Sequence, residues 1–258
     1  MRRALARIAR QAQEMNFFDE IETLTEHDLD VQYIEKHKHL LKRSVRGFGY
    51  WVWKPYVIWR ALQTMEDGDE LYYVDAGCHF NPKGRTRMLE YAEILRENAL
   101  GLAGFELTPD CSVGAFTKMD LLAHMGMVNR EDLLSCAQIC ATHVFCRKNE
   151  KVMAFLGDWL QICEHIHLVD DSPSVLPNVS NFVEHRHDQS VFTLLCLQYG
   201  AALLPGRETW PENNTRDWGT MLNYPIWDKR DLGLTMHSLS RLRRKVWRRF
   251  IKPLFRFK

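Results

Sequence analysis

The stretch ELYYVDAGC, residues 70–78, decides the fold class that the sequence predicts. It follows turn-forming residues at 67–69 and contains a β-prone apolar run, residues 71–74, that ends in one carboxylate, Asp75. We interpret it as a buried strand that ends in an acid. In an open α/β sheet, ligands bind beyond the carboxyl ends of the strands, and Gly77 would let the backbone approach a ligand closely. Asp75 is therefore the first candidate site residue, and the alternative is an aspartate that only caps its own turn.

The composition is typical of a globular protein of enzyme size. The 258 residues are 46% hydrophobic and 26% charged, which suits one large α/β domain. No apolar run approaches the roughly 20 residues of a spanning helix, and MRRALARIAR at the start lacks the uncharged core of a signal peptide. The seven cysteines include no Cys-x-x-Cys pair, which indicates reduced core thiols. We expect a cytoplasmic protein with one domain, residues 1–236, and a tail, residues 237–258.

Charge is distributed unevenly along the chain. Residues 241–258 hold nine Lys or Arg, residues 1–10 hold four Arg, and neither segment contains an acid. Residues 11–240 hold the other 21 of the 34 basic residues and all 33 acidic ones, a formal charge of −12. An acidic body with a basic end indicates a surface-anchoring tail, and such a body would repel nucleic acid. We expect no nucleic-acid partner.

Hydrophobic periodicity predicts alternating helices and strands along the chain. Predicted helices cover 2–15, with Arg2, Arg3, Arg7 and Arg10 outward, 26–42, 55–65, the segment from the loop 79–85 to about 98, 120–127, 150–167 and the segment from 188 to a stop signal at Gly200. Besides the stretch at 70–78, predicted strands cover 17–25, 102–106 and 136–145. The spacing Thr117-x-x-Asp120 predicts a capping box at the start of the helix 120–127.

An aromatic block precedes the helix that begins at Pro55. It places Trp51 and Trp53 beside Lys54, after two glycines that permit tight backbone. The two tryptophans are equally well explained as core residues. Lys54 is harder to explain in that way, because a lysine at a helix start can meet a phosphate or a sugar hydroxyl, with the free N–H groups of the first turn nearby.

A second polar group lies at residues 184–190, EHRHDQS, before an apolar helical segment. Asp188 is placed to be the N-cap of that helix, with solvated histidines before it. The functional alternative is that the same residues bind a ligand. His187 and carboxylate oxygens suit a divalent metal, Arg186 suits phosphate, and the pair Asp188 and Gln189 suits sugar hydroxyls.

Four segments in this order and spacing resemble the bacterial and viral glycosyltransferases of the GT-A fold. They are GFGYWVWKP at 47–55, YVDAG at 73–77, TKMD at 117–120 and HDQS at 187–190. The resemblance covers about residues 10–205. It implies an α/β, Rossmann-like domain that binds a nucleotide-sugar and has a mixed, mainly parallel sheet. It also implies a hexosyltransferase-like enzyme that moves a sugar from a nucleotide-diphosphate donor to a glycan or glycolipid acceptor, in the synthesis of a surface polysaccharide.

The resemblance also implies roles for single residues. In such enzymes an acidic motif at a strand end, usually Asp-x-Asp, holds Mn²⁺ or Mg²⁺ on the donor diphosphate, and that role falls to Asp75. Asp188 and Gln189 resemble the pair that touches the donor sugar near the anomeric carbon, and they are the predicted catalytic residues. The predicted donor-binding residues are Trp53, Lys54, Asp75, Gly77 and Arg186.

Two departures from the family pattern change what is expected. The second carboxylate of the acidic motif is missing, so the metal would be held by Asp75 and His187 or bound weakly. A GT-A domain also normally opens with a strand that contacts the nucleotide, whereas this sequence starts in a helix. A catalytically inactive relative that binds sugar or membrane is therefore the alternative function.

The C-terminal residues predict a basic amphipathic helix. Leu239, Leu242, Val246 and Phe250 fall on one helical face, and basic residues occupy the remainder. Such a helix can lie on an anionic membrane surface, where each Lys or Arg contributes about 1 kcal/mol. We expect residues 238–258 to hold the protein at the inner face of the membrane as a peripheral protein. The alternatives are a helix packed on the acidic body and a basic-tailed adaptor without enzymatic activity.

Overall fold

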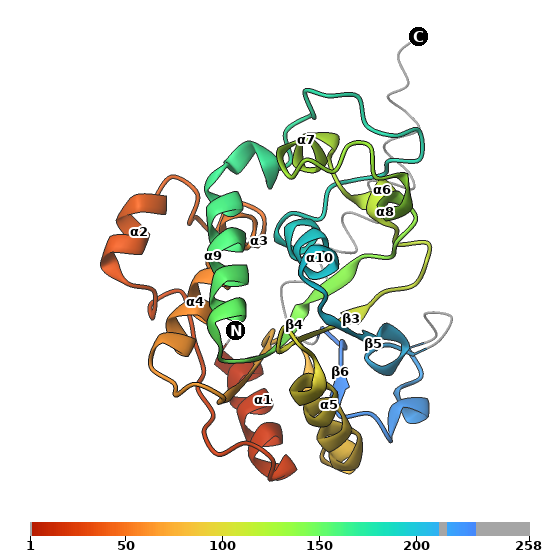
Figure 1. The fold of residues 1–258 in the computed structure, drawn as a ribbon. Coiled ribbons are helices and arrows are strands. Elements are labelled where there is room, and N and C mark those ends of the chain that lie inside the picture. Colours follow the sequence, from red (N-terminus) through yellow and green to blue (C-terminus); the bar gives the residue numbers. More distant parts are fainter. Residues whose placement is uncertain (1, 212–215, 231–258) are drawn as a thin grey trace, which may run out of the picture.

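The computed structural model describes residues 2–211 and 216–230, so the predicted tail helix lies outside the described residues. The centre of the fold is a four-stranded sheet in the order β1-β4-β3-β5 (Figure 1). Its strands are β1 (Glu70–Val74), β3 (Leu102–Glu106), β4 (Ile139–Arg147) and β5 (Ala202–Pro205). The prediction of a mixed α/β fold is confirmed.

The prediction of a mainly parallel sheet is wrong, because two of the three strand pairs in the sheet are antiparallel. β4 lies between β1 and β3 and pairs antiparallel with both, whereas β3 and β5 pair parallel. β1, β3 and β5 consequently run in the same direction, and β4 runs against them. The pattern of helices and strands along the chain does not reveal this arrangement, because a strand's direction depends on which neighbour it joins.

Helices cover both faces of the sheet (Figure 1). On one face pack α4 (Trp53–Gln63), α9 (Glu150–Glu164) and α10 (Asp188–Tyr199), and on the other pack α1 (Arg2–Met15) and α5 (Arg85–Glu97). Strand β4 serves both cores, because Val144 and Cys146 join the first and Phe145 the second. This explains why β4 is a nearly continuous apolar run instead of an alternating one.

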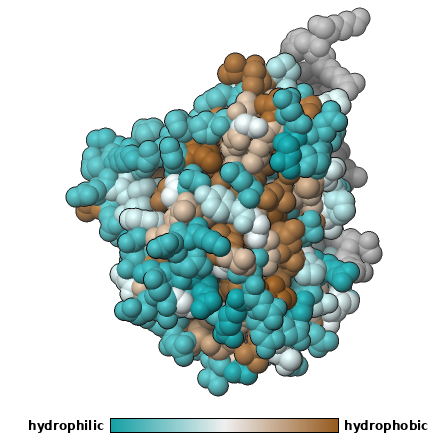
Figure 2. All heavy atoms as spheres, viewed as in Figure 1, coloured by the Kyte–Doolittle hydropathy of each residue, from teal (hydrophilic) through white to brown (hydrophobic). Residues whose placement is uncertain are grey.

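Smaller elements complete the described chain. A two-stranded antiparallel ladder joins β2 (His79–Phe80) to β6 (Ile226–Trp227). The remaining elements are α2 (Val31–His37), α3 (Gly47–Tyr50), η1 (Pro82–Gly84), α6 (Val113–Phe116), α7 (Met119–His124), α8 (Glu131–Leu134), η2 (Ile166–Leu168), η3 (Gly206–Glu208) and η5 (Trp218–Met221). Within the described ranges, no helix is long and apolar enough to cross a membrane. Figure 2 shows mostly hydrophilic side chains on the viewed face, with apolar ones along its centre.

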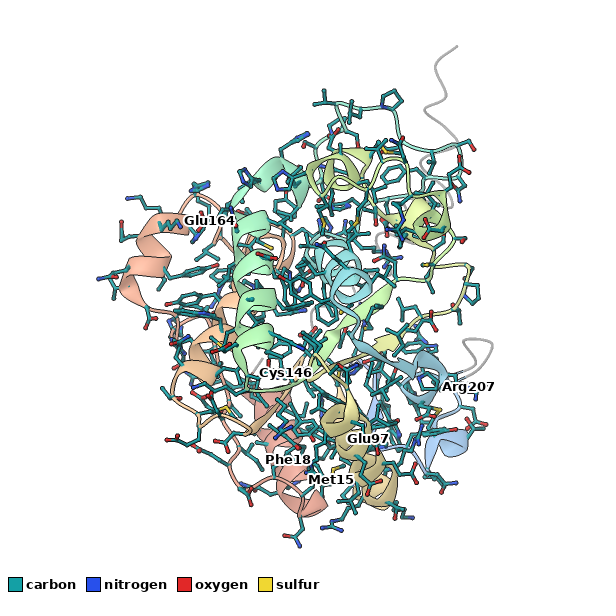
Figure 3. The ribbon with its side chains drawn as sticks, viewed as in Figure 1. Met15, Phe18, Glu97, Cys146, Glu164 and Arg207 are labelled. Carbon is teal, nitrogen blue, oxygen red and sulfur yellow. The ribbon has the colours of Figure 1, made fainter. Side chains whose placement is uncertain are left out.

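The strand predicted at 17–25 is wrong, because that segment is coil. Phe17 and Phe18 both contact the ring of Tyr72, with ring centres 5.4 and 5.7 Å apart. Neighbouring residues of a strand point to opposite faces and could not share one partner in this way. Phe18 packs against the core cluster that contains Met15, the last residue of α1, and both are labelled in Figure 3. No strand precedes β1 in residues 2–69.

Three further predictions are corrected. The helix predicted at 26–42 forms only over 31–37. Arg7 does not point outward, because its guanidinium donates hydrogen bonds to the carbonyls of Ala76 at 3.1 Å and Cys78 at 2.9 Å. There is no capping box, because the Asp120 carboxylate instead accepts hydrogen bonds from the backbone of residues 175 and 176. Asp120 thus accepts hydrogen bonds from backbone N–H groups, as a capping residue does, but these groups belong to a distant loop and not to its own helix.

Gly84 provides a test of how tightly the β2–β6 unit packs on α5. A Cβ atom at Gly84 would lie 2.4 Å from the backbone of Tyr224 and Pro225, which cannot move without disturbing the ladder. We expect Gly84→Ala to lower the free energy of unfolding by about 1 to 3 kcal/mol. The control is Gly157→Ala in α9, where a Cβ atom meets nothing within 4 Å and where alanine should stabilise the helix by about 1 kcal/mol. Urea unfolding measures both, and equal stability of the two variants would contradict the packing.

Candidate functional site

A cleft of about 1890 Å³ runs beside β1. Its lining includes the coil of residues 17–27, the start of α4, residues 75–77 and residues 186–189. All eight residues that the sequence singled out line this cleft: Trp53, Lys54, Asp75, Gly77, Arg186, His187, Asp188 and Gln189. Tertiary structure thus brings three separate sequence segments to one place.

Lys54 lies at the centre of the site and links two of these segments. Its ammonium nitrogen donates a hydrogen bond to the carbonyl of Ala141 at 2.9 Å. The same nitrogen lies 3.3 Å from Oδ2 of Asp188 and 3.6 Å from Oδ1 of Asp75. We call Lys54, Asp75 and Asp188 the lysine–aspartate cluster. Lys54 and Asp188 are 3% exposed, whereas the side chain of Asp75 is 31% exposed, so Asp75 is the member that a ligand can reach.

Burial and charge act against each other in the lysine–aspartate cluster. Burial disfavours the Lys54 ammonium, but Asp188 and Asp75 outweigh it and raise the pKa of Lys54. Burial raises the pKa of Asp188 to about 6, although Lys54 opposes the shift. Because the pKa of the Asp188 carboxyl in the folded state exceeds the ordinary value, protonation of Asp188 stabilises the fold. That contribution is present at low pH and is lost as the pH rises through about 6.

Tyr73 is a site residue that the sequence analysis did not single out. Its hydroxyl donates a hydrogen bond to Oδ1 of Asp75 at 2.7 Å, and its ring lies 5.6 Å from the Lys54 ammonium. Burial, with Asp75 next, raises the pKa of Tyr73, so the hydroxyl stays a donor. Tyr73 and Asp75 are two residues apart in an extended segment and therefore share a face. This two-residue period was the signal in the sequence that could have identified Tyr73 as a neighbour of Asp75.

Asp188 does not cap its helix. The N-cap of α10 is His187, whose side chain makes no cap hydrogen bond, and Asp188 is the first helical residue. The Asp188 side chain is directed to Lys54 instead. The expectation of free N–H groups in the first turn of the helix that carries Lys54 is wrong for Lys54 itself, because its amide donates to the Trp51 carbonyl at 2.9 Å.

His187 is placed differently from its predicted role as a metal ligand beside Asp75. Its Nδ1 pairs with the carbonyl of Val169 at 2.7 Å, and its Nε2 lies 3.6 Å from Oδ1 of Asp171. Burial is the main reason that the pKa of His187 is lowered. Some side chains in the described part of the chain do cluster closely enough to hold a metal ion, but Asp75 and His187 are not among them.

The surroundings of Asp75 do not fit Mn²⁺ or Mg²⁺. These hard cations require several oxygen ligands. Here a buried ammonium stands 3.6 Å from Asp75, the carboxylate of the lysine–aspartate cluster that a ligand can reach, and would repel a second cation. The charge that a metal would supply is already present on Lys54.

A left-handed turn forms the wall of the site next to Lys54. Residues 47–51 all have positive φ, from +54° to +93°, and this includes Phe48, Tyr50 and Trp51. Such backbone costs roughly 1–2 kcal/mol for each residue that is not glycine. The rings of Tyr50 and Trp51 lie 5.2 and 5.6 Å from the ring of His187, which also has a positive φ of 58°. Strained backbone held by packing is typical of functional sites.

The other predicted residues line the cleft without joining the lysine–aspartate cluster. Arg186 lies over the ring of Phe116 at 4.4 Å and pairs with Glu184 at 3.4 Å, on the accessible side. The Trp53 indole donates a hydrogen bond to the carbonyl of Gly47 at 3.1 Å, which ties α4 to the left-handed turn. Gly77 and Gln189 form part of the lining.

Comparison with protein-family models, with curated proteins and with solved structures finds no match for this chain.

Removal of Lys54 tests the charge balance of the site. In Lys54→Met, two carboxylates lose their shared cation, and we expect a loss of about 3 to 5 kcal/mol in the free energy of unfolding at neutral pH. The loss should be smaller near pH 5, because Asp188 then takes up a proton. The double variant Lys54→Met/Asp188→Asn should recover part of it.

Urea unfolding at the two pH values measures these effects. The control is Lys36→Met, which removes an exposed ion pair with Glu164 and should cost no more than about 1 kcal/mol at either pH. An equal loss in Lys54→Met and Lys36→Met would show that the buried pairing does not stabilise the fold.

Proposed function

We propose that the protein is a glycosyltransferase that moves a sugar from a nucleotide-diphosphate donor to a glycan or lipid-linked acceptor. The observation that carries the proposal is the convergence of Lys54, Asp75 and Asp188, from three segments, on the lining of one cleft. A cleft of about 1890 Å³ exceeds the roughly 300–1,000 Å³ of a single-ligand pocket and has room for a donor and an acceptor.

The roles follow from exposure. Asp75 is the carboxylate that can meet a hydroxyl of the acceptor, because its side chain is partly exposed and is oriented by Tyr73. Asp188 and Lys54 lie beneath it and act as positioning residues. Above about pH 6, Asp188 is ionised and adds a negative charge to the lysine–aspartate cluster.

Arginines on the lining supply positive charge for the departing diphosphate. The side chains of Arg46 and Arg186 are 43% and 38% exposed, and each is held by one ion pair, with Asp171 and Glu184. Exposed pairs of this kind contribute little and exchange readily for phosphate, which arginine binds with two parallel hydrogen bonds. The tryptophan rings at 51 and 53 also line the cleft and offer faces for a sugar or a base.

Variants of the two aspartates test these roles. We expect Asp75→Asn to abolish turnover of a nucleotide-sugar without unfolding the protein, because it removes the reachable base. Asp188→Asn should lower turnover by about 10- to 100-fold and remove a step near pH 6 from the pH profile of kcat, since the group that titrates there is gone.

The measurement is the release of nucleoside diphosphate from a panel of nucleotide-sugars. The control is Asp158→Asn, because Asp158 accepts a hydrogen bond from the Tyr199 hydroxyl and neither residue lines the cleft. Donor binding without release by the wild type would favour the inactive sugar-binding relative. An active Asp75→Asn variant would contradict the assignment of the base.

We further propose that residues 238–258 hold the enzyme at an anionic membrane surface, where a lipid-linked acceptor would be found. This proposal rests on the basic amphipathic pattern of the sequence, which includes nine Lys or Arg from 241 onward.

Deletion of residues 238–258 tests this proposal. We expect the shortened protein to remain in solution with phosphatidylglycerol vesicles at low salt, where the full chain sediments, and to keep its donor hydrolysis. Uncharged phosphatidylcholine vesicles are the control, because they remove the electrostatic attraction. Equal sedimentation of the two proteins would overturn the membrane role.

A further inference from the structure

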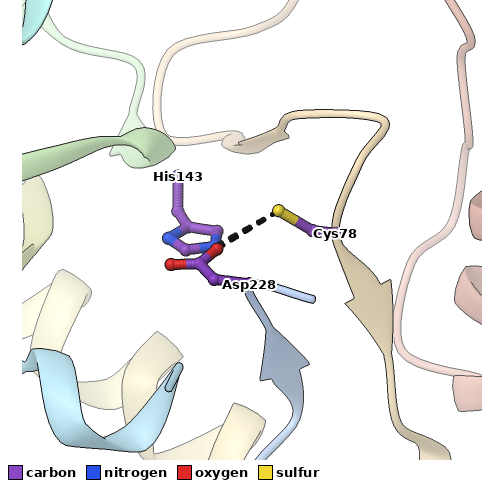
Figure 4. A group of neighbouring side chains, drawn as sticks. All are labelled: Cys78, His143 and Asp228. Carbon is purple, nitrogen blue, oxygen red and sulfur yellow. Dashed lines mark hydrogen bonds and ion pairs between the residues drawn. The ribbon is translucent and has the colours of Figure 1, made fainter. Parts of the chain in front are cut away.

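A second cluster of polar side chains lies buried behind the loop that carries Asp75. Cys78, His143 and Asp228 come from three separate segments and point toward one another (Figure 4). Cys78 precedes β2, His143 lies in β4, and Asp228 follows β6. Cys78 and His143 are fully buried, and Asp228 is 6% exposed. We call these residues the Cys–His–Asp cluster.

Three atoms of the cluster converge on one point. Nε2 of His143 lies 2.8 Å from Oδ1 of Asp228 and 3.7 Å from Sγ of Cys78, and Sγ lies 3.3 Å from Oδ1. Zinc bonds of about 2.3 Å to sulfur and about 2.0–2.2 Å to nitrogen or oxygen give separations of about 3.4 to 3.6 Å between tetrahedral ligands. The observed triangle therefore approaches one face of a zinc tetrahedron, and an outward shift of about half an ångström in the nitrogen–oxygen pair completes it.

Hydrogen bonding directs the thiol to the carboxylate, because Sγ of Cys78 donates to Oδ1 of Asp228 at 3.3 Å. Cys78 and Asp228 both face the same nitrogen of His143, and one N–H group cannot serve both well. Asp228 is the nearer partner, because its Oδ1 lies 2.8 Å from Nε2 of His143, whereas Sγ of Cys78 lies 3.7 Å from that nitrogen. A relay of the kind found in nucleophilic triads would instead place the acid and the thiol on opposite nitrogens.

Charge and outer contacts also suit a divalent ion. A thiolate, a carboxylate and a neutral imidazole around Zn²⁺ sum to zero charge, which a buried site requires. The second carboxylate oxygen of Asp228 accepts a hydrogen bond from the Thr209 hydroxyl at 3.2 Å, and the Asp228 amide donates to the Thr209 carbonyl at 2.8 Å. Such outer contacts fix the orientation of a metal ligand.

We propose that Cys78, His143 and Asp228 bind one Zn²⁺ ion, with water as the fourth ligand. The ion replaces the thiol proton and the proton that His143 shares with Asp228, both of which pass to solvent. It joins the end of β6 and the loop after Asp75 to the central strand β4. The Cys78 amide donates to the Asp75 carbonyl at 2.9 Å, so the ion would also fix the loop that presents Asp75. The proposal is independent of the proposed function.

Metal titration of the full chain tests the site directly. Reduced protein, freed of metal with a chelator, is titrated with Co²⁺ and then with Zn²⁺. We expect one equivalent of Co²⁺ to produce a sulfur-to-cobalt charge-transfer absorption, which one equivalent of Zn²⁺ abolishes. We also expect Zn²⁺ to raise the Tm, because an ion that binds only the folded state stabilises it. Absence of the absorption at one equivalent would overturn the proposal.

Two cysteine variants assign the sulfur. Cys78→Ser should lose the charge-transfer absorption and the Tm shift with Zn²⁺. Cys146→Ser should keep both, because Cys146 is equally buried in β4 but packs in the other core, away from the cluster. Asp228→Asn should keep the absorption but weaken Zn²⁺ binding at least tenfold. Loss of the absorption in Cys146→Ser as in Cys78→Ser would assign the metal to another thiol and overturn the site.

Discussion

The buried ammonium of Lys54 is the charge on which the arrangement of the cleft depends. An ammonium this deep is tolerated only when acceptors surround it, and here they come from β4, the end of β1 and the start of α10. Its place in the first turn of α4 is itself unfavourable, since the helix dipole repels a cation there. The carboxylates of Asp75 and Asp188 offset both costs, so the site forms only when these elements have docked.

The same constraint explains the strained backbone nearby. The left-handed turn at 47–51 and the positive φ of His187 place the rings of Tyr50 and Trp51 against the ring of His187. The hydrogen bond from Trp53 to Gly47 ties that turn to the helix that carries Lys54. The strain in the turn and at His187 is balanced by packing, so the carboxylates are held before any ligand arrives.

The loop after β1 is anchored from several directions. Arg7 of α1 donates to its carbonyls, the amide of Asp75 donates to the carbonyl of Thr142, and Cys78 reaches Asp228. A carboxylate fixed in this way meets a substrate hydroxyl at a defined place. The lysine–aspartate cluster and the Cys–His–Asp cluster thus lie at the two ends of one four-residue segment, 75–78. The first faces the cleft, whereas the second lies in the interior.

The sequence by itself determined the elements with strong periodicity and singled out eight of the residues that line the cleft. β3, α5 and the start of α10 occur where predicted, because apolar spacing reports burial directly. Predictions from local pattern failed where a residue distant in sequence determined the structure. The segment 17–25 packs as coil on Tyr72, Asp120 accepts a hydrogen bond from a remote loop, and Asp188 pairs with Lys54 instead of capping its helix. Only the tertiary structure decided strand direction, the pairing of Lys54 and the meeting of Cys78 with His143 and Asp228, because residues up to 150 positions apart become neighbours only on folding.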